Sequence, residues 1–161
     1  MTELWVINAS PLILLGKSGQ LDWLPQLGHI VIPRGVAEEV TEGSSEDPAR
    51  MWLYSAVGTA CIFEVEKASD ELLAWDLGKG ETEVLSWAQH HPNYEAVLDD
   101  AAARRCGAVF GLRLRGTLSL VALAKKRGLI QECRPVFDRL KAAGLFVTPS
   151  LIEKVARSVG E

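Results

Sequence analysis

The sequence is poor in cysteine and histidine, which limits the chemistry it can support. Its 161 residues include three cysteines, Cys61, Cys106 and Cys133, and no two of them have a C-x-x-C spacing. An odd number of widely separated cysteines indicates neither a disulfide framework nor a zinc site. We therefore expect these thiols to pack as small apolar side chains in the core. The three histidines show no metal-ligand spacing either.

Long apolar runs are also missing. Runs such as residues 12–15 fall far short of the ~20 residues that a membrane-spanning helix needs. The apolar run at residues 4–7 follows Met1 almost at once, without the basic region and longer apolar stretch of a signal peptide. Apolar residues make up 48% of the chain and charged residues 24%, as in ordinary soluble proteins. We expect a cytoplasmic protein that folds as one domain over residues 1–161.

Motifs for nucleophilic catalysis and phosphate binding are absent as well. The sequence contains no G-x-S-x-G elbow and no G-x-x-x-x-G-K-[ST] phosphate loop. The glycines at 78, 80 and 107 are too scattered for a dinucleotide-binding fingerprint. The sequence indicates no side-chain nucleophile.

Short apolar runs alternate with helical patterns along the chain. Strands are predicted at residues 4–7, 29–32, 60–65, 94–98 and 108–111. Helices are predicted from the Ser10 cap through residue 15, and at residues 21–27, 35–41, 48–57, 81–90, 101–106, 117–127, 131–143 and 149–159. This alternation predicts an α/β fold with a mostly parallel sheet.

Charge is distributed unevenly, although the net charge is only −4. Residues 1–103 carry 17 acidic and five basic side chains, whereas residues 104–141 carry ten basic and two acidic ones. An acidic half that could hold cations, beside a basic half that could hold phosphates, is typical of a nuclease. The alternative is that the basic residues are simply solvated helix faces.

Polar residues collect where predicted strands end or helices begin. Ligands of open parallel sheets bind outside the carboxyl ends of the strands. The candidates at that edge are Asn8, Glu81 and the pair Asp99 and Asp100, and Glu39 follows on the same helix face as two valines. We expect Glu39 to point inward and to share a hard cation, because burying an unpaired charge is costly. Oxygen ligands of this kind select Mg²⁺ or Mn²⁺ over zinc.

Each of these residues also has a structural interpretation. Glu81 would favour a helix dipole, and Asp99 or Asp100 would cap the helix that follows. Asn8 would hold a turn, and Glu39 would lie on a solvated helix face. Only their joint placement at one sheet edge favours a metal site.

The same positions carry a resemblance to the PIN-domain family, in particular to uncharacterised proteins related to VapC toxins. The matching segments cover nearly the whole chain and occur in the family's order. They are residues 6–13 (VINASPLI), 32–40 (IPRGVAEEV), 80–88 (GETEVLSWA), 98–104 (LDDAAAR), and 115–118 (RGTL) followed by 124–130 (AKKRGLI).

The resemblance implies a three-layer α/β/α sandwich around a five-stranded, mostly parallel sheet. It implies Mg²⁺- or Mn²⁺-dependent cleavage of single-stranded RNA, often as the toxin of a toxin–antitoxin pair, with a small antitoxin protein as partner. The metal ligands would be Asn8, Glu39, Glu81 and Asp99 or Asp100, with Asp99 favoured, and the four acidic residues would be catalytic. Ser10, Arg104 and Thr117 are assigned to substrate binding.

One residue departs from the family pattern. Position 8 is the leading Asp of most PIN nucleases, and here it is Asn. An amide oxygen can bind a hard cation but adds no negative charge and cannot act as a base. The alternative function is therefore a catalytically weakened PIN-like module that binds RNA or a protein. A receiver-like signalling domain is a third reading, weakened by the absence of an acidic pair after the first strand.

A homodimer is a further expectation for the partners. Trp52, Trp75 and Trp87 are predicted on helices, where an exposed Trp would serve as an interface anchor. Burial in the core is the competing expectation for each of the three.

Overall fold

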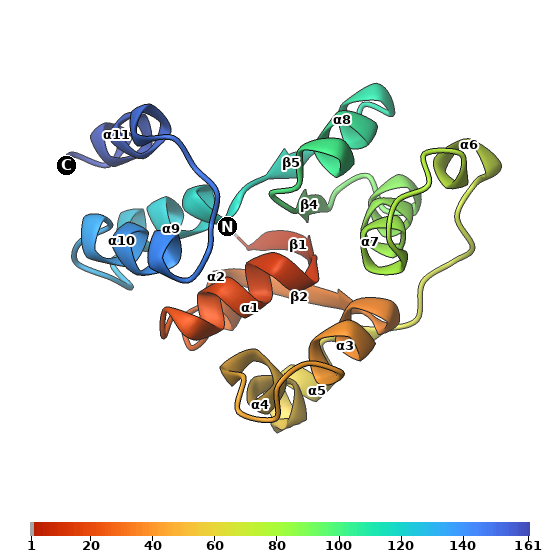
Figure 1. The fold of residues 1–161 in the computed structure, drawn as a ribbon, viewed down its shortest axis with the longest axis horizontal. Helices are drawn as coiled ribbons and strands as arrows, with labels where there is room; N and C mark the ends of the chain where they lie inside the picture. The colour runs from red at the N-terminus through yellow and green to blue at the C-terminus, as the bar shows by residue number, and fades with distance from the viewer. Residues whose placement is uncertain (1) are drawn as a thin grey trace.

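The computed structural model describes residues 2–161, and a five-stranded parallel sheet runs through its centre (Figure 1). The strand order is β3-β2-β1-β4-β5, and every neighbouring pair is parallel. In β1, Trp5, Val6 and Ile7 are fully buried, as expected for a strand covered on both faces. The strands are β1 (Glu3–Ile7), β2 (Gly28–Pro33), β3 (Ile62–Phe63), β4 (Glu95–Val97) and β5 (Leu114–Arg115).

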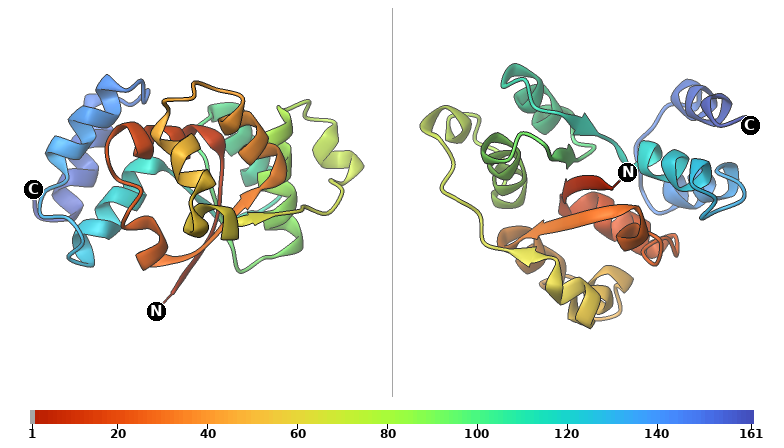
Figure 2. Two further views of the ribbon diagram at one scale, coloured as in Figure 1. Left: turned by 90° about the horizontal axis from the view of Figure 1, so that it is seen from below. Right: turned by 180° about the vertical axis from the view of Figure 1, so that it is seen from behind.

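Helices cover both faces of this sheet, which confirms the predicted α/β fold. The helices are α1 (Ala9–Lys17), α2 (Leu24–Leu27), α3 (Arg34–Thr41), α4 (Pro48–Tyr54), α5 (Ala56–Ala60), α6 (Asp70–Leu73), α7 (Lys79–His90), α8 (Ala101–Val109), α9 (Thr117–Lys126), α10 (Arg134–Ala142) and α11 (Pro149–Ser158). Figures 1 and 2 place α1, α9 and α10 on one side of the sheet and α7 and α8 on the other. The short α6 lies at the outer edge of the fold beside α7.

The fifth strand is not where the sequence places it. A strand was expected at residues 108–111, but Ala108 and Val109 are the last residues of α8, and β5 follows at Leu114–Arg115. Gly111, with φ +67°, lies in the turn between them. A strand of two residues is too short to produce a readable alternation, and the helix α6 of four residues escapes prediction for the same reason.

Two helix boundaries also differ from the prediction. The helix α1 begins at Ala9 with Asn8 at the N-cap, so Ser10 lies inside the first turn and does not cap it. The helix expected over residues 48–57 is split at Ser55, whose hydroxyl caps α5 by accepting a hydrogen bond from the Gly58 N–H. Both differences follow from local capping geometry.

The core confirms the role expected of the buried cysteines. Cys106 and Cys133 are fully buried, and Cys61 packs against the core while partly exposed. Of the three tryptophans considered for an interface, Trp87 is buried and Trp75 is 37% exposed in a turn after α6, outside any helix. Within residues 2–161, no helix combines the length and apolar character needed to cross a membrane.

Candidate active site

A pocket of about 460 Å³ opens where the starts of α1 and α7 meet α3. It lies outside the carboxyl ends of β1 and β2, the position that open parallel sheets use for ligands. Three of the candidate metal-binding residues, Asn8, Glu39 and Glu81, line it together with Ser10. The remaining lining residues are Ala9, Gly35, Glu38, Glu42, Gly78, Lys79 and Gly80.

Asn8 sits at the innermost wall of this pocket. It follows β1 directly, and its backbone N–H donates a 3.0 Å hydrogen bond to the carbonyl of Val97, which fixes it between β1 and β4. Its side chain is 5% exposed and does not cap α1. Within the described chain, its Oδ1 is buried without a hydrogen-bond donor. An unsatisfied buried oxygen is costly, so this atom calls for a ligand.

Glu39 approaches the same point from α3. A Cβ at Gly80 would lie 3.0 Å from Oε2 of Glu39 and 3.5 Å from Oδ1 of Asn8, so both oxygens face one glycine. The expectation that Glu39 is turned into the core is wrong, because its side chain is exposed while Val36 and Val40 are buried. Glu39 lies at the edge of the buried helix face and lines the pocket from its open side.

Glu81 lines the pocket from a third element, the first turn of α7. Its partial burial raises the pKa of its carboxyl above the usual range, and the nearby charges of Asp100 and Glu39 raise it further. Negative charges near a carboxylate disfavour its ionised form, and a cation bound between them would offset that repulsion. The effect of Glu39 and Asp100 on the pKa of Glu81 therefore places the three carboxylates in one electrostatic environment.

The two aspartates after β4 have different surroundings. Both oxygens of Asp99 accept hydrogen bonds from Thr117, at 3.0 Å from its N–H and 2.6 Å from its hydroxyl. Asp100 caps α8 with one oxygen, which accepts a 3.0 Å bond from the Ala103 N–H. Asp100 is exposed, and its charge raises the pKa of Glu81. Asp99 instead lines a separate cavity of about 280 Å³.

Arg104 also lies in that second cavity, away from the acidic pocket. Its guanidinium donates a 2.9 Å hydrogen bond to the carbonyl of Leu98, at the end of β4. Thr117, fully buried, is occupied with Asp99. Of the three residues assigned to substrate binding, only Ser10 lines the acidic pocket.

Part of the basic half of the chain is engaged in ion pairs. Four of its ten basic residues have a carboxylate partner within 3.1 Å. These pairs are Arg115 with Glu95, Lys125 with Glu161, Arg127 with Glu3, and Arg134 with Glu153. Charge already neutralised within the fold contributes less to phosphate binding, so the residue count overstates the basic surface.

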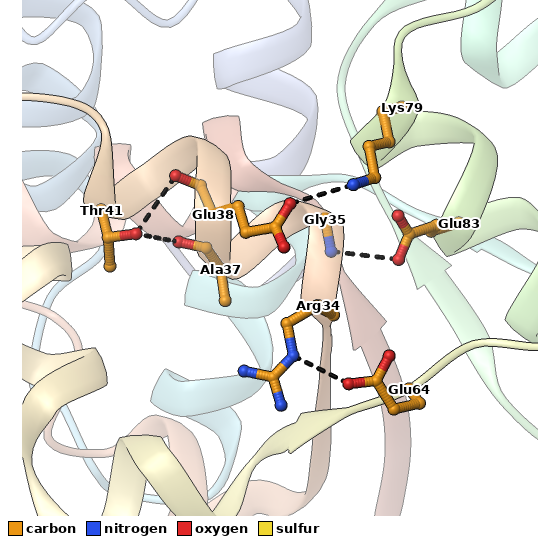
Figure 3. A network of polar contacts seen from close by, with 8 residues as sticks. All are labelled: Arg34, Gly35, Ala37, Glu38, Thr41, Glu64, Lys79 and Glu83. Carbon is orange, nitrogen blue, oxygen red and sulfur yellow. Dashed lines mark hydrogen bonds and ion pairs between the residues drawn. The ribbon is translucent and has the colours of Figure 1, made fainter.

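Sequence reasoning missed two contacts that join α3 to α7 beside the pocket (Figure 3). The N–H of Gly35 donates a 3.0 Å hydrogen bond to the carboxylate of Glu83, and Lys79 forms a 2.9 Å ion pair with Glu38. The partners are more than 40 residues apart in sequence, so local patterns carry little information about either contact. Only the G-E-x-E spacing, which puts a second glutamate on α7, hints at the first.

A family model described as a PIN domain matches residues 4–161 of this chain. The chain belongs to the PIN-domain family. No curated protein matches it in sequence. PIN domains are typically metal-dependent nucleases, and PIN nucleases act on RNA. The all-parallel five-stranded sheet agrees with this family's fold.

The donor set of this PIN domain fits a hard divalent cation. Carboxylates and one buried amide oxygen are the ligands that Mg²⁺ and Mn²⁺ prefer. In the described part of the chain, no three Asp, Glu, His or Cys side chains already stand close enough to form a metal cluster. The residues that would hold such a cation are Asn8, Glu39, Glu81 and Asp100.

Proposed function

We propose that this PIN domain is a Mg²⁺- or Mn²⁺-dependent endoribonuclease that cleaves single-stranded RNA. Its metal ligands are Asn8, Glu39, Glu81 and Asp100. The observation that carries the proposal is the Oδ1 of Asn8, buried without a donor and facing the same glycine as Glu39. A cation in this position would satisfy the orphaned oxygen, and it would offset both the burial and the repulsion that raise the pKa of Glu81.

The side chains divide the work at this site. When bound, a divalent cation of this kind lowers the pKa of a water and polarises a phosphodiester. Glu39, Glu81 and Asp100 supply negative charge, and Asn8 supplies a neutral oxygen at a fixed position. Ser10, exposed in the first turn of α1, offers a hydroxyl to the RNA backbone. Asp99 holds Thr117, and with it the start of α9, against the end of β4, where Asp100 follows.

The biological setting belongs to the same proposal. The segments that resemble VapC-related proteins extend over nearly the whole chain, which supports one PIN-like domain over residues 1–161 acting as the toxin of a toxin–antitoxin pair. A small antitoxin protein is its partner, and a second copy of the chain is another. The partly exposed Trp75 is a candidate anchor for either.

A second function is favoured by the identity of residue 8. With Asn in place of the family's leading Asp, the pocket has one negative charge fewer, and metal affinity falls with ligand charge. A weakened relative of this kind would survive as a module that binds RNA or a protein partner. The two functions differ in whether the wild-type chain cleaves RNA.

The test is cleavage of a single-stranded RNA in the presence and absence of Mn²⁺. The wild type and three variants, Glu81→Ala, Asn8→Asp and Glu71→Ala, are compared under the same conditions. Glu71 is an exposed residue of α6 outside the pocket, so its variant controls for the loss of a surface glutamate. We expect Mn²⁺-dependent cleavage by the wild type and Glu71→Ala, and none by Glu81→Ala.

Two results would contradict the enzyme proposal. Cleavage by Glu81→Ala at the wild-type rate would show that the activity does not come from this pocket. A wild type without activity, restored by Asn8→Asp, would identify the chain as the weakened binding module.

A further inference from the structure

At two places, a glutamate of one of the helices α3 and α7 lies against a glycine of the other. Glu83 of α7 reaches the N-terminal turn of α3, where one of its oxygens accepts a 3.0 Å hydrogen bond from the Gly35 N–H (Figure 3). Glu39 of α3 lies close to Gly80 of α7, where a Cβ would come within 3.0 Å of its Oε2. A Cβ at Gly35 would overlap the Glu83 carboxylate, so the approach depends on glycine there.

The Glu83 contact is suited to fix α3 in place. The first N–H groups of a helix have no partner within the helix, and no side chain caps α3 from its own N-cap residue, Pro33. A carboxylate at this end satisfies one of them and complements the helix dipole. The bond is partly buried, so water competes less for it than at the surface.

The other polar contacts of this region are exposed. The pair of Lys79 with Glu38 and the pair of Arg34 with Glu64 have side chains that are 49% exposed or more. Exposed pairs contribute about 0–1 kcal/mol, and salt screens them. The Glu83 contact is therefore the least exposed of these three polar contacts, and it adds to the packing of buried apolar residues between α3 and α7.

We propose that Glu83 is a positioning residue of the active site: by holding the N-terminus of α3 against α7, it sets the distance from Glu39 to Glu81. This inference rests on the proposed function, since Glu39 and Glu81 are the ligands that it positions. We place Glu83 outside the ligand set because one oxygen of its carboxylate is held by the Gly35 N–H at the start of α3.

The experiment measures Mn²⁺ affinity by titration calorimetry and hydrogen exchange of the α3 amides by mass spectrometry. Glu83→Ala removes the acceptor, and Glu83→Gln keeps an acceptor oxygen without the charge. Glu64→Ala is the matched control, since it removes the glutamate that pairs with the neighbouring Arg34 on the exposed side of α3. Losing an outer-shell partner typically lowers metal affinity about 10–100-fold.

We expect Glu83→Ala to lose Mn²⁺ affinity by about this factor and to exchange the α3 amides faster. Glu83→Gln should recover most of both, and Glu64→Ala should change neither. Gly35→Ala should imitate Glu83→Ala, and the double variant should be no worse than either single one, because both break the same contact.

Equal losses in Glu83→Gln and Glu83→Ala would still support the positioning role, with the charge at the N-terminus of α3 as its source, because Gln keeps an acceptor oxygen but not the charge. Unchanged affinity and unchanged exchange in Glu83→Ala would overturn the proposal. A wild type that binds no Mn²⁺ would instead contradict the proposed function. In that case the exchange measurement still shows whether Glu83 holds α3.

Discussion

Asp99 and Thr117 are joined by two hydrogen bonds, one to each oxygen of the carboxylate. Thr117 is fully buried and begins α9, while Asp99 follows β4, so the pair fastens a helix to the end of a central strand. Both oxygens of Asp99 thus have a structural task at the site where a metal ligand was favoured from the sequence. Within residues 2–161, only one oxygen of the neighbouring Asp100 accepts a hydrogen bond, and the charge of Asp100 raises the pKa of Glu81.

Replacing Thr117 by Val should destabilise the fold while leaving the shape of the side chain nearly unchanged. The substitution removes the 2.6 Å bond to a charged acceptor, and hydrogen bonds to charged groups contribute ~1.5–3 kcal/mol. Urea unfolding should show a loss of this size. In an Asp99→Ala background the same change should cost less, because the partner is gone. Strictly additive losses would show that the two residues do not act as a pair.

Replacing Gly80 by Ala should lower Mn²⁺ affinity without lowering the free energy of unfolding. A Cβ there would lie 3.0 Å from Oε2 of Glu39, a flexible and exposed group that can move aside, and 3.3 Å from Cγ2 of the buried Val36, which needs to shift only by a few tenths of an ångström. Gly80→Ala should therefore keep or raise the free energy of unfolding, since Ala favours a helix by ~1 kcal/mol over Gly. Mn²⁺ affinity should fall, because Glu39 is displaced from Asn8.

The control for that prediction is Gly78→Ala in the same turn. A Cβ at position 78 would meet no atom within 4 Å, so it should leave Mn²⁺ affinity unchanged. Equal affinities for Gly80→Ala and the wild type in calorimetric titration would show that Glu39 is not a ligand.

The parts of the fold that the sequence predicts are those with a strong local signal. The buried runs that form β1 and β2 are continuous and apolar, so their position needs no information from elsewhere in the chain. The strand β5 has only two residues, and its register is set by its pairing with β4, in which Ala96 lies opposite Leu114. Its identity as a strand is created by tertiary pairing, which explains why the run at residues 108–111 was preferred.

The site shows the same division. Asn8 was predictable because the end of a buried strand in a parallel sheet is a binding position by topology. The exposure of Glu39 was not, because helical spacing assigns a residue to a face but does not say where that face ends. The contact of Glu83 with Gly35 spans 48 residues of sequence and depends on how two helices approach. Such contacts are visible only in three dimensions.

Restoring the family's Asp at position 8 should make folding depend on metal. Asn8→Asp places a charge in a site that is 5% exposed and faces Glu39, and an uncompensated buried charge costs about 3–5 kcal/mol. The melting temperature without metal should fall, and Mn²⁺ should raise it by more than in the wild type, because the cation binds only the folded state. Asn93→Asp, at an exposed position, is the control and should shift little. A variant that responds to Mn²⁺ no more than the wild type would remove position 8 from the ligand set.

The carboxylate of Glu161 should make stability sensitive to acid. Burial alone would raise the pKa of Glu161, but hydrogen bonds from the N–H of Cys133, from Lys125 and from the N–H of Arg134 outweigh it and hold the pKa at about 2. Because this value lies below the ordinary 4.5, the carboxylate stabilises the fold fully above pH 4.5, and that contribution is lost as the pH falls toward 2.

Glu161→Gln removes this contribution at every pH. The melting temperature of the wild type should therefore exceed that of the variant at pH 7, and the gap should narrow between pH 4.5 and 2 as the wild-type carboxylate gains its proton. Glu132→Gln, an exposed residue next to Cys133, should show no gap that changes with pH. A difference in melting temperature between wild type and Glu161→Gln that stays constant down to pH 2 would contradict this prediction. The loss of stability would then come from the altered packing and hydrogen bonding of the amide, and not from the missing charge.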